Sequence, residues 1–250
     1  MNIAVTTVNR KVNFLDITIE SLKLGILPDE KINLFVGRNE YDYVEKYKKN
    51  ESFNVITDLY EREKNLTTTQ AASYGYYRAL TLSQDPILIV EDDVMLKKDW
   101  RSFLDQAIKI IEDDAYIITF VCPFDWCVPN RRLLETDPIL QKFQYKADVV
   151  QTGAGTKADI IIFTWCNTSA VYYSKGLLQT RLPEFVNRYA IDDKAIYDLA
   201  IGYYLFNMNI PIYVVVPDGA VNLGGEPVFS AMQNFSKRGH TNYLDWDWKK

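Results

Sequence analysis

The stretch Pro86-Ile-Leu-Ile-Val-Glu-Asp-Asp-Val-Met95 joins an uninterrupted apolar run to three consecutive carboxylates. The run Ile87–Val90 contains two isoleucines and a valine, and a short apolar run with polar flanks predicts a central strand that is buried on both faces. Parallel strands of an open α/β sheet present their ligands at their carboxyl ends. We therefore expect this strand to carry Glu91, Asp92 and Asp93 to the edge of the sheet where a ligand would lie.

These three carboxylates, Glu91–Asp93, form the acidic motif, which has two interpretations. Adjacent carboxylates repel one another unless a cation or hydrogen-bond donors compensate their charge. Hard oxygen ligands of this kind suit Mg²⁺ or Mn²⁺, and these ions in turn bind phosphates. Alternatively, acidic residues after a strand simply form a solvated loop or favour the N-terminus of a following helix. The motif by itself leaves both interpretations open.

Strands and helices alternate through the first half of the chain. Short apolar runs predict the strands, and apolar residues at helical spacing predict the helices between them. We expect strands at Ile3–Val8, Ile32–Val36, Phe53–Ile56 and Tyr116–Val121, with helices from near Leu15 and within Glu40–Ser52 and Asn65–Ser83. This alternation predicts an α/β fold with a mostly parallel central sheet flanked by helices and joined by right-handed crossovers.

The helix after the acidic motif has the clearest amphipathic pattern. Its apolar residues recur at positions i, i+3, i+4, i+7, i+8 and i+11, which places them on one face of a helix. They are Trp100, Phe103, Leu104, Ala107, Ile108 and Ile111. Asp99 directly precedes this pattern and is the expected N-cap.

The second half of the chain is less regular. Pro123–Lys157 contains prolines and charged residues and predicts loops with short helices. Further on we expect strands at Ile160–Phe163, Ser169–Tyr173 and Ile212–Val216, and a helix opened by Asp192-Asp193. No internal repeat or low-complexity linker is visible. We expect a single domain over residues 1–250, with two functional halves at 1–121 and 122–250.

Composition narrows the class of protein. The chain has 250 residues, of which 48% are hydrophobic, so it can form one large α/β core. Its net charge of −5 gives no general attraction to nucleic acid. The three cysteines lack metal-like pairing and are typical of a reducing compartment. The sequence has no evident signal peptide and no apolar run of membrane-spanning length. We therefore expect a soluble, cytoplasmic protein of bacterial, phage or viral origin.

Four features, in order along the chain, resemble the GT-A glycosyltransferases, which use nucleotide-sugar donors. Val5–Arg10 looks like their first strand and nucleotide-facing loop, and Ile87–Asp93 looks like the strand that carries their DxD-type motif, here in a Glu-Asp-Asp form. Ile191-Asp192-Asp193 is similar to their late acidic motif, although Glu-Asp is commoner there. His240 lies where many of them have a C-terminal metal-binding histidine. The joint order favours the functional interpretation of the acidic motif.

The resemblance implies a GT-A, Rossmann-like fold with a nucleotide-binding first half and an acceptor-binding second half. It also implies metal-dependent transfer of a hexosyl or N-acetylhexosaminyl group from a nucleotide-sugar, expected to be a UDP-sugar, to an acceptor hydroxyl. Asp93 would be the direct ligand of Mn²⁺ or Mg²⁺, and His240 would complete the metal site. Asp92 and Glu91 would face the ribose, the sugar or a metal-bound water. By itself, His240 is better explained as an ordinary surface or packed histidine, and the two interpretations balance only once the acidic motif is accepted as functional.

An inverting transfer needs a general base that takes the proton from the acceptor hydroxyl. By its position in the late acidic motif, Asp193 is the first candidate for this base and Asp192 the second. Both residues also fit a role as caps of a helix N-terminus, so the base and the cap remain alternatives. If neither carboxylate reaches the acceptor, a retaining mechanism remains open.

Nucleotide contacts are expected from the residues around the end of the first strand: Thr6, Thr7, Val8 and Arg10. Asp58, just past the third strand, could accept a hydrogen bond from the base. The alternative for Arg10 and Asp58 is plain surface charge. Three aromatic residues are candidates either for stacking on a sugar or for the core: Trp126, Trp165 and Tyr243.

Two other classes of function compete with glycosyl transfer. A nucleotidyltransferase would use a similar sheet and acidic metal ligands, but would favour a glycine-rich basic loop after the first strand, where this chain has Thr6-Thr-Val-Asn-Arg10. A non-catalytic nucleotide- or carbohydrate-binding module could retain the pocket without the chemistry. The acceptor could be a glycan, a lipid-linked sugar, a protein or, less favoured by the net negative charge, a nucleic-acid base.

Overall fold

The computed structural model describes residues 1–9, 13–37, 42–57, 66–82, 84–120, 146–151, 157–162, 168–192, 197–214 and 219–223. Within them, a seven-stranded sheet has the strand order β10-β6-β9-β4-β1-β2-β3. Its strands are β1 (Asn2–Val8), β2 (Ile32–Gly37), β3 (Phe53–Ile56), β4 (Ile87–Glu91), β6 (Ile117–Thr119), β9 (Ala170–Tyr173) and β10 (Ile212–Val214). Strand β9 runs antiparallel to β4 and β6, and the other neighbours are parallel. The predicted α/β class with a mostly parallel sheet is confirmed.

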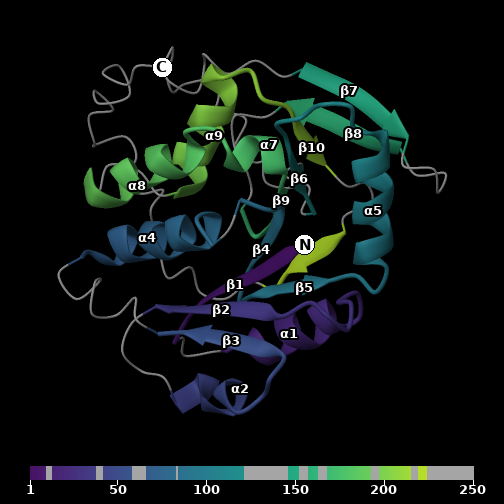
Figure 1. Cartoon of the computed structure of the whole chain (residues 1–250). Helices are drawn as coiled ribbons and strands as arrows, with labels where there is room; N and C mark the ends of the chain where they lie inside the picture. The colour runs from purple at the N-terminus through teal and green to yellow at the C-terminus, as the bar shows by residue number, and fades with distance from the viewer. Residues whose placement is uncertain are drawn as a thin grey trace.

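The helices cover both faces of this sheet (Figure 1). They are α1 (Leu15–Lys23), α2 (Glu45–Lys48), α4 (Thr68–Leu80), α5 (Trp100–Ile110), α7 (Lys175–Leu178), α8 (Leu182–Asp192) and α9 (Tyr197–Asn207), with a 3₁₀ turn, η1, at Asp42–Val44. Helices α4, α7, α8 and α9 contribute to one hydrophobic cluster, and α1, α2 and α5 contribute to the other. The central sheet therefore lies between two helical layers.

The position of β4 in the sheet explains why the apolar run Ile87–Val90 is uninterrupted. Ile87 and Ile89 belong to the cluster on the α4 side of the sheet, whereas Leu88 and Val90 belong to the cluster on the α1 side. All four side chains are at most 1% exposed. Because successive side chains of a strand point to opposite faces, a strand covered on both faces needs apolar residues at every position.

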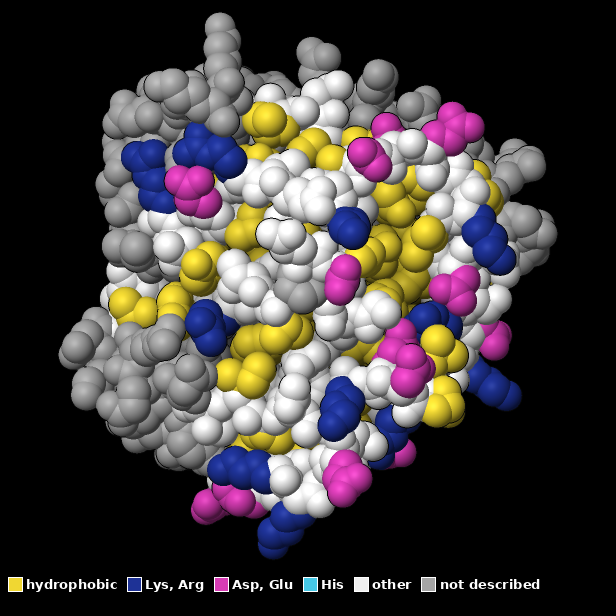
Figure 2. Space-filling view, viewed as in Figure 1, with side chains coloured by type: hydrophobic (Ala, Val, Ile, Leu, Met, Phe, Trp, Pro, Cys, Tyr) yellow, Lys and Arg dark blue, Asp and Glu magenta, His cyan; other side chains and the backbone are white. Residues whose placement is uncertain are grey.

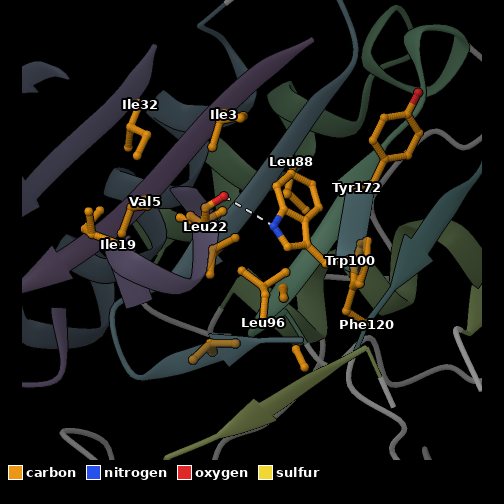
Figure 3. Close-up of a cluster of buried hydrophobic side chains, with 14 of the residues drawn as sticks. Ile3, Val5, Ile19, Leu22, Ile32, Leu88, Leu96, Trp100, Phe120 and Tyr172 are labelled. Carbon is orange, nitrogen blue, oxygen red and sulfur yellow. Dashed lines mark hydrogen bonds between the residues drawn. The ribbon is translucent and has the colours of Figure 1, made fainter. Parts of the chain in front are cut away.

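Trp100 joins α5 to α1 on the same side of the sheet (Figure 3). Its indole Nε1 donates a hydrogen bond of 3.3 Å to the carbonyl oxygen of Leu22, the penultimate residue of α1. Trp100 is the first residue of α5, and Asp99 occupies the N-cap position as predicted. The Asp99 side chain makes no capping hydrogen bond, however, so the position was predicted correctly and its bonding was not.

Helix α4 has a complete capping box at its start. Thr67 Oγ1 accepts a hydrogen bond from the backbone N–H of Gln70, and the Gln70 side chain accepts one from the backbone N–H of Thr67. This reciprocal pair satisfies two N–H groups that the helix itself leaves without partners. The helix predicted within Asn65–Ser83 is thus confirmed, with Thr67 as its N-cap.

Two small two-stranded sheets accompany the central one. Strand β5 (Val94–Leu96) pairs antiparallel with β11 (Ala220–Asn222), and β7 (Lys146–Gln151) pairs antiparallel with β8 (Lys157–Ile162). The prediction of loops with short helices across Pro123–Lys157 is therefore wrong for β7. Lys146–Val149 alternate charged and apolar residues, which is a local strand signal that the prediction overlooked.

The prediction that Asp192-Asp193 opens a helix is also wrong for its first residue. Asp192 is the last residue of α8, and the next described helix, α9, begins at Tyr197. Helix α8 was not predicted. Proline is well tolerated in the first turn of a helix, and Pro183 is the second residue of α8.

The division into a single domain of two halves stays a prediction. No helix among the described residues is long and apolar enough to cross a membrane.

Candidate functional site

The carboxyl ends of β1 and β4 lie side by side. The two strands are parallel neighbours, and Thr6 lies opposite Glu91 in their register. The residues that follow each of these positions therefore come together at one edge of the sheet, where α/β proteins bind ligands. This arrangement brings the predicted nucleotide-facing strand end and the acidic motif to the same place.

Asp92 is tied directly to β1. Its Oδ2 accepts a hydrogen bond of 2.7 Å from Thr7 Oγ1 and one of 3.1 Å from the backbone N–H of Val8. The Thr7 hydroxyl also lies 3.4 Å from the Tyr43 hydroxyl. Asp92 is only 2% exposed, so these donors compensate a carboxylate that has been almost wholly removed from water.

Helix α1 holds the backbone of the turn between β4 and β5. Thr18 Oγ1 donates a hydrogen bond of 2.9 Å to the carbonyl oxygen of Asp92. One turn later, Ser21 Oγ accepts a hydrogen bond of 3.0 Å from the backbone N–H of Leu96. Both side chains are buried polar residues on the inner face of α1, and each fixes one end of the segment that contains Asp93.

Asp93 lies in that turn and is 7% exposed. Its carbonyl oxygen accepts a hydrogen bond of 2.8 Å from the backbone N–H of Leu223, which directly follows β11. Leu223 is the last described residue before the C-terminal segment that contains His240. That segment therefore leaves the described fold from a residue bonded to Asp93.

Glu91, the last residue of β4, is directed toward the second half of the chain. Its Oε1 accepts a hydrogen bond of 2.6 Å from the Tyr197 hydroxyl and one of 3.1 Å from Thr168 Oγ1. Burial, together with the negative charge of Glu91, raises the pKa of the Tyr197 hydroxyl well above its usual value of 10.0. Tyr197 therefore keeps its proton and acts as the donor to the carboxylate.

The structure describes six of the predicted site residues with their side chains: Thr6, Thr7, Val8, Glu91, Asp92 and Asp93. It brings them together at one edge of the sheet. Arg10, Asp58, Asp193 and His240 lie outside the described residues, as do Trp126, Trp165 and Tyr243, and Asp192 is described only as the end of α8. The roles assigned to all these residues stay predictions.

Three residues that contact the acidic motif were not predicted: Thr18, Thr168 and Tyr197. A polar residue in the middle of the apolar face of α1 was a usable signal for Thr18, which is 0% exposed. Nothing in the local sequence distinguishes Tyr197 from the other tyrosines of the chain, which has 17 of them. Its contact with Glu91 joins residues 106 positions apart and follows from the fold alone.

A metal ion at this site would find oxygen donors of the right chemistry. The carboxylates of the acidic motif are hard ligands, which Mg²⁺ and Mn²⁺ prefer. Within the described part of the chain, His, Cys, Asp and Glu side chains do not form a group of three that could hold a metal ion. A ligand set centred on Asp93 thus needs a further protein ligand from beyond these residues, or oxygens from the bound substrate.

The charged side chains around the fold are mixed in sign. Figure 2 shows Lys and Arg interspersed with Asp and Glu over the described surface of the face viewed there. The described surface on this face thus presents no broad field of one sign that would by itself attract a polyanion.

No protein-family model matches the sequence, and no curated protein sequence matches it. Among solved structures, the chain is similar to a bifunctional glycosyltransferase, WbbM, at 10% identity and a TM-score of 0.45, over 80% of this chain and 36% of that one. It is similar to the glycosyltransferase GlyE of Streptococcus pneumoniae at 12% identity and a TM-score of 0.48, over 99% of this chain and 60% of that one.

A third similar structure is mouse xyloside xylosyltransferase 1, at 11% identity and a TM-score of 0.43, over 86% of this chain and 84% of that one. The chain thus spans less than two thirds of the first two structures. All three TM-scores lie below 0.5.

Proposed function

We propose that this chain is a metal-dependent glycosyltransferase that moves a sugar from a nucleotide-sugar donor, a UDP-sugar by the sequence resemblance, to an acceptor hydroxyl. The observation that carries the proposal is the meeting of β1 and the acidic motif at the carboxyl edge of a mostly parallel sheet. There Asp92 is bonded to Thr7 and Val8, and Asp93 lies in the adjoining turn.

The burial of these acids supports a role beyond a solvated loop. Asp92 and Asp93 are 2% and 7% exposed, whereas a simple charged loop would keep its carboxylates in water. Burial of two neighbouring carboxylates costs free energy that the Thr7 and Val8 donors offset for Asp92. A cation bound by Asp93 would offset the remaining repulsion, which is a physical reason to keep such a costly arrangement.

In this proposal Asp93 holds Mn²⁺ or Mg²⁺, with His240 as a further ligand from the C-terminal segment. A bound cation supplies charge neutralisation for the diphosphate leaving group. The end of β1 binds the nucleoside, with Thr6 and Val8 nearest to it and Thr7 committed to Asp92. Arg10 and Asp58 remain candidates for further nucleotide contacts.

We further propose an inverting transfer in which Asp193, or in second place Asp192, takes the proton from the acceptor hydroxyl. The position of Asp192 argues against a plain capping role, because a carboxylate at the C-terminus of a helix is disfavoured by the helix dipole. Asp193 precedes Tyr197 by four residues, and Tyr197 is hydrogen-bonded to Glu91. The late acidic motif is thus followed closely along the chain by Tyr197, which is hydrogen-bonded to the acidic motif at the end of β4.

The first test is calorimetric binding of a panel of nucleoside diphosphates and their sugars, with and without Mn²⁺. We expect one nucleotide to bind only with Mn²⁺, and Asp93→Ala to abolish that binding. Asp29→Ala is the matched control, because Asp29 is an exposed acid in the turn before β2 and should leave binding unchanged. If no nucleotide binds with any divalent cation, the proposal fails.

Turnover then separates the remaining classes of function. A glycosyltransferase should hydrolyse its donor slowly to free sugar and nucleoside diphosphate, and Asp193→Asn should lower this rate or the transfer rate while donor affinity is kept. A binding module would bind the same nucleotide without turnover. A nucleotidyltransferase would release pyrophosphate from a nucleoside triphosphate instead.

A further inference from the structure

The Glu91 side chain is held by two hydroxyl donors from the second half of the chain. The Tyr197 hydroxyl and Thr168 Oγ1 both donate to the same carboxylate oxygen, Oε1, at 2.6 Å and 3.1 Å. Tyr197 is the first residue of α9, and Thr168 lies just before β9. The carboxylate at the end of β4 is thus engaged by α9 and by the segment before β9. The predicted contact of Glu91 with the ribose, the sugar or a metal-bound water stays a prediction.

Tyr197 is itself fixed in place by the core. Its ring stacks on Tyr76 of α4, with ring centroids 4.4 Å apart and planes inclined by 14°. The Tyr76 hydroxyl shares a hydrogen bond of 2.8 Å with the Tyr173 hydroxyl on β9. The phenol that bonds Glu91 is therefore pre-oriented by packing, so little conformational entropy is lost in making the bond.

The first two carboxylates of the acidic motif thus accept hydrogen bonds from different parts of the fold. Thr7 and Val8 from β1 engage Asp92, whereas Tyr197 and Thr168 engage Glu91. Hydrogen bonds to a carboxylate stabilise its negative charge, and each of these two carboxylates has donors of its own.

We infer that Tyr197 is a positioning residue of the acidic motif, which holds Glu91 against α9 so that this carboxylate does not occupy coordination positions that the donor diphosphate needs. This inference rests on the proposed function. It makes Glu91 an anchor of the site, and it leaves direct coordination of the cation to Asp93. It also assigns a role to a residue with no recognisable local motif.

The test compares Mn²⁺-dependent nucleotide binding in wild type, Tyr197→Phe, Glu91→Gln and the double variant. In Tyr197→Phe the ring still stacks on Tyr76, but the freed Glu91 carboxylate competes with the phosphates for Mn²⁺. We expect the dissociation constant of the nucleoside diphosphate to rise about tenfold, because the charged hydrogen bond that restrains Glu91 from this competition is lost. The affinity for Mn²⁺ alone, measured by electron paramagnetic resonance, should not fall.

Glu91→Gln distinguishes an anchor from a ligand. The amide oxygen can still accept hydrogen bonds from Tyr197 and Thr168, but the side chain no longer competes as an anion. We therefore expect nucleotide affinity within about threefold of wild type, and little further change when Tyr197→Phe is added to it. If Glu91→Gln abolishes binding as Asp93→Ala does, or if the effects of the two substitutions simply add, the inference is wrong.

Tyr77→Phe is the matched control on the neighbouring helix. Tyr77 is a half-buried tyrosine of α4 that packs beside the same core cluster, and no hydrogen bond of its hydroxyl is recorded among the described residues. Equal behaviour of Tyr197→Phe and Tyr77→Phe would overturn the inference. Thr168→Val, which removes the longer of the two hydrogen bonds, should act in the same direction as Tyr197→Phe but more weakly.

Amide hydrogen exchange separates a failure of this inference from a failure of the proposed function. If wild type binds no nucleotide, the glycosyltransferase proposal fails, but the positioning role is still decided by exchange at the acidic motif and the first turn of α9. Faster exchange at both in Tyr197→Phe, but not in Tyr77→Phe, supports positioning. Unchanged exchange in Tyr197→Phe contradicts it.

Discussion

Thr7 on β1 donates a hydrogen bond of 2.7 Å to Oδ2 of Asp92, although 85 residues separate the two along the chain. Both side chains are almost fully buried, at 4% and 2% exposure. This bond joins the end of the first strand to the turn after β4, because β1 and β4 are neighbours in the sheet. It fixes the distance between the two parts of the candidate donor site.

Replacing Thr7 with valine should lower the free energy of unfolding by about 1–3 kcal/mol, because a buried carboxylate loses a donor while the shape of the side chain is kept. Urea unfolding measures this difference. The control is Thr81→Val, whose hydroxyl bonds backbone carbonyls at the exposed end of α4 and should cost under about 1 kcal/mol. Equal losses in the two variants would show that the Thr7–Asp92 bond adds nothing to stability.

Gly25 marks a close contact between the end of α1 and Trp100. A Cβ at this position would lie 2.5 Å from Cε2 of the indole and 2.8 Å from Cβ of Arg101. We expect Gly25→Ala to lower the free energy of unfolding by about 1–3 kcal/mol, through overpacking of a filled core. Thermal unfolding followed by circular dichroism measures the loss.

A second substitution tests whether the indole is the cause of that loss. Trp100→Phe removes the indole atoms nearest to position 25, although it also removes the hydrogen bond to Leu22. Gly25→Ala should therefore cost less in the Trp100→Phe background than in wild type. If the cost is the same in both backgrounds, steric conflict with Trp100 is not its source.

Glu30 and Arg101 form a partly buried ion pair in which one guanidinium nitrogen contacts both carboxylate oxygens. Arg101 Nη1 lies 3.1 Å and 2.9 Å from the two carboxylate oxygens of Glu30, whose side chain is 6% exposed. Burial opposes ionisation of Glu30, but the bonds and charge of Arg101 outweigh it and hold the pKa of the carboxyl below its usual value of 4.5. The unfolded chain therefore takes up this proton at higher pH than the folded chain does.

It follows that this pair contributes stability above pH 4.5, and that the contribution is lost as the pH falls through the lowered pKa of the folded state. Glu30→Gln should be less stable than wild type at pH 7, and the difference should shrink toward pH 3 in urea titrations. Glu45→Gln, which alters an exposed pair with Lys48, should show no such convergence. A constant difference for Glu30→Gln across this range would contradict the assignment.

Tyr76 and Tyr173 share a buried hydrogen bond between their hydroxyls, with oxygens 2.8 Å apart. Either single change to phenylalanine should cost about 1–2 kcal/mol, because the other hydroxyl is left in the core with fewer partners. The double variant should cost less than the sum of the single ones, and chemical unfolding of all four proteins gives this coupling. Strict additivity would mean that the two hydroxyls do not stabilise each other.

The sequence by itself predicted the alternation of β1, α1, β2, α2, β3, α4, β4 and α5, and the place of the acidic motif at the end of β4. These features are local: an apolar run or a helical repeat carries its signal within about ten residues. The strand β7 was missed although Lys146–Val149 alternate charged and apolar residues, because this signal covers only four residues.

Only the tertiary structure decided which side chains compensate the charges of the acidic motif. Thr7, Thr168 and Tyr197 have no local pattern that links them to it. Strand order in the sheet and the packing of α9 bring them within hydrogen-bonding distance across 77 to 106 residues of chain. The physical reason is that a buried carboxylate must find its donors wherever the fold places them, and the fold is fixed by the burial of the two hydrophobic clusters as a whole.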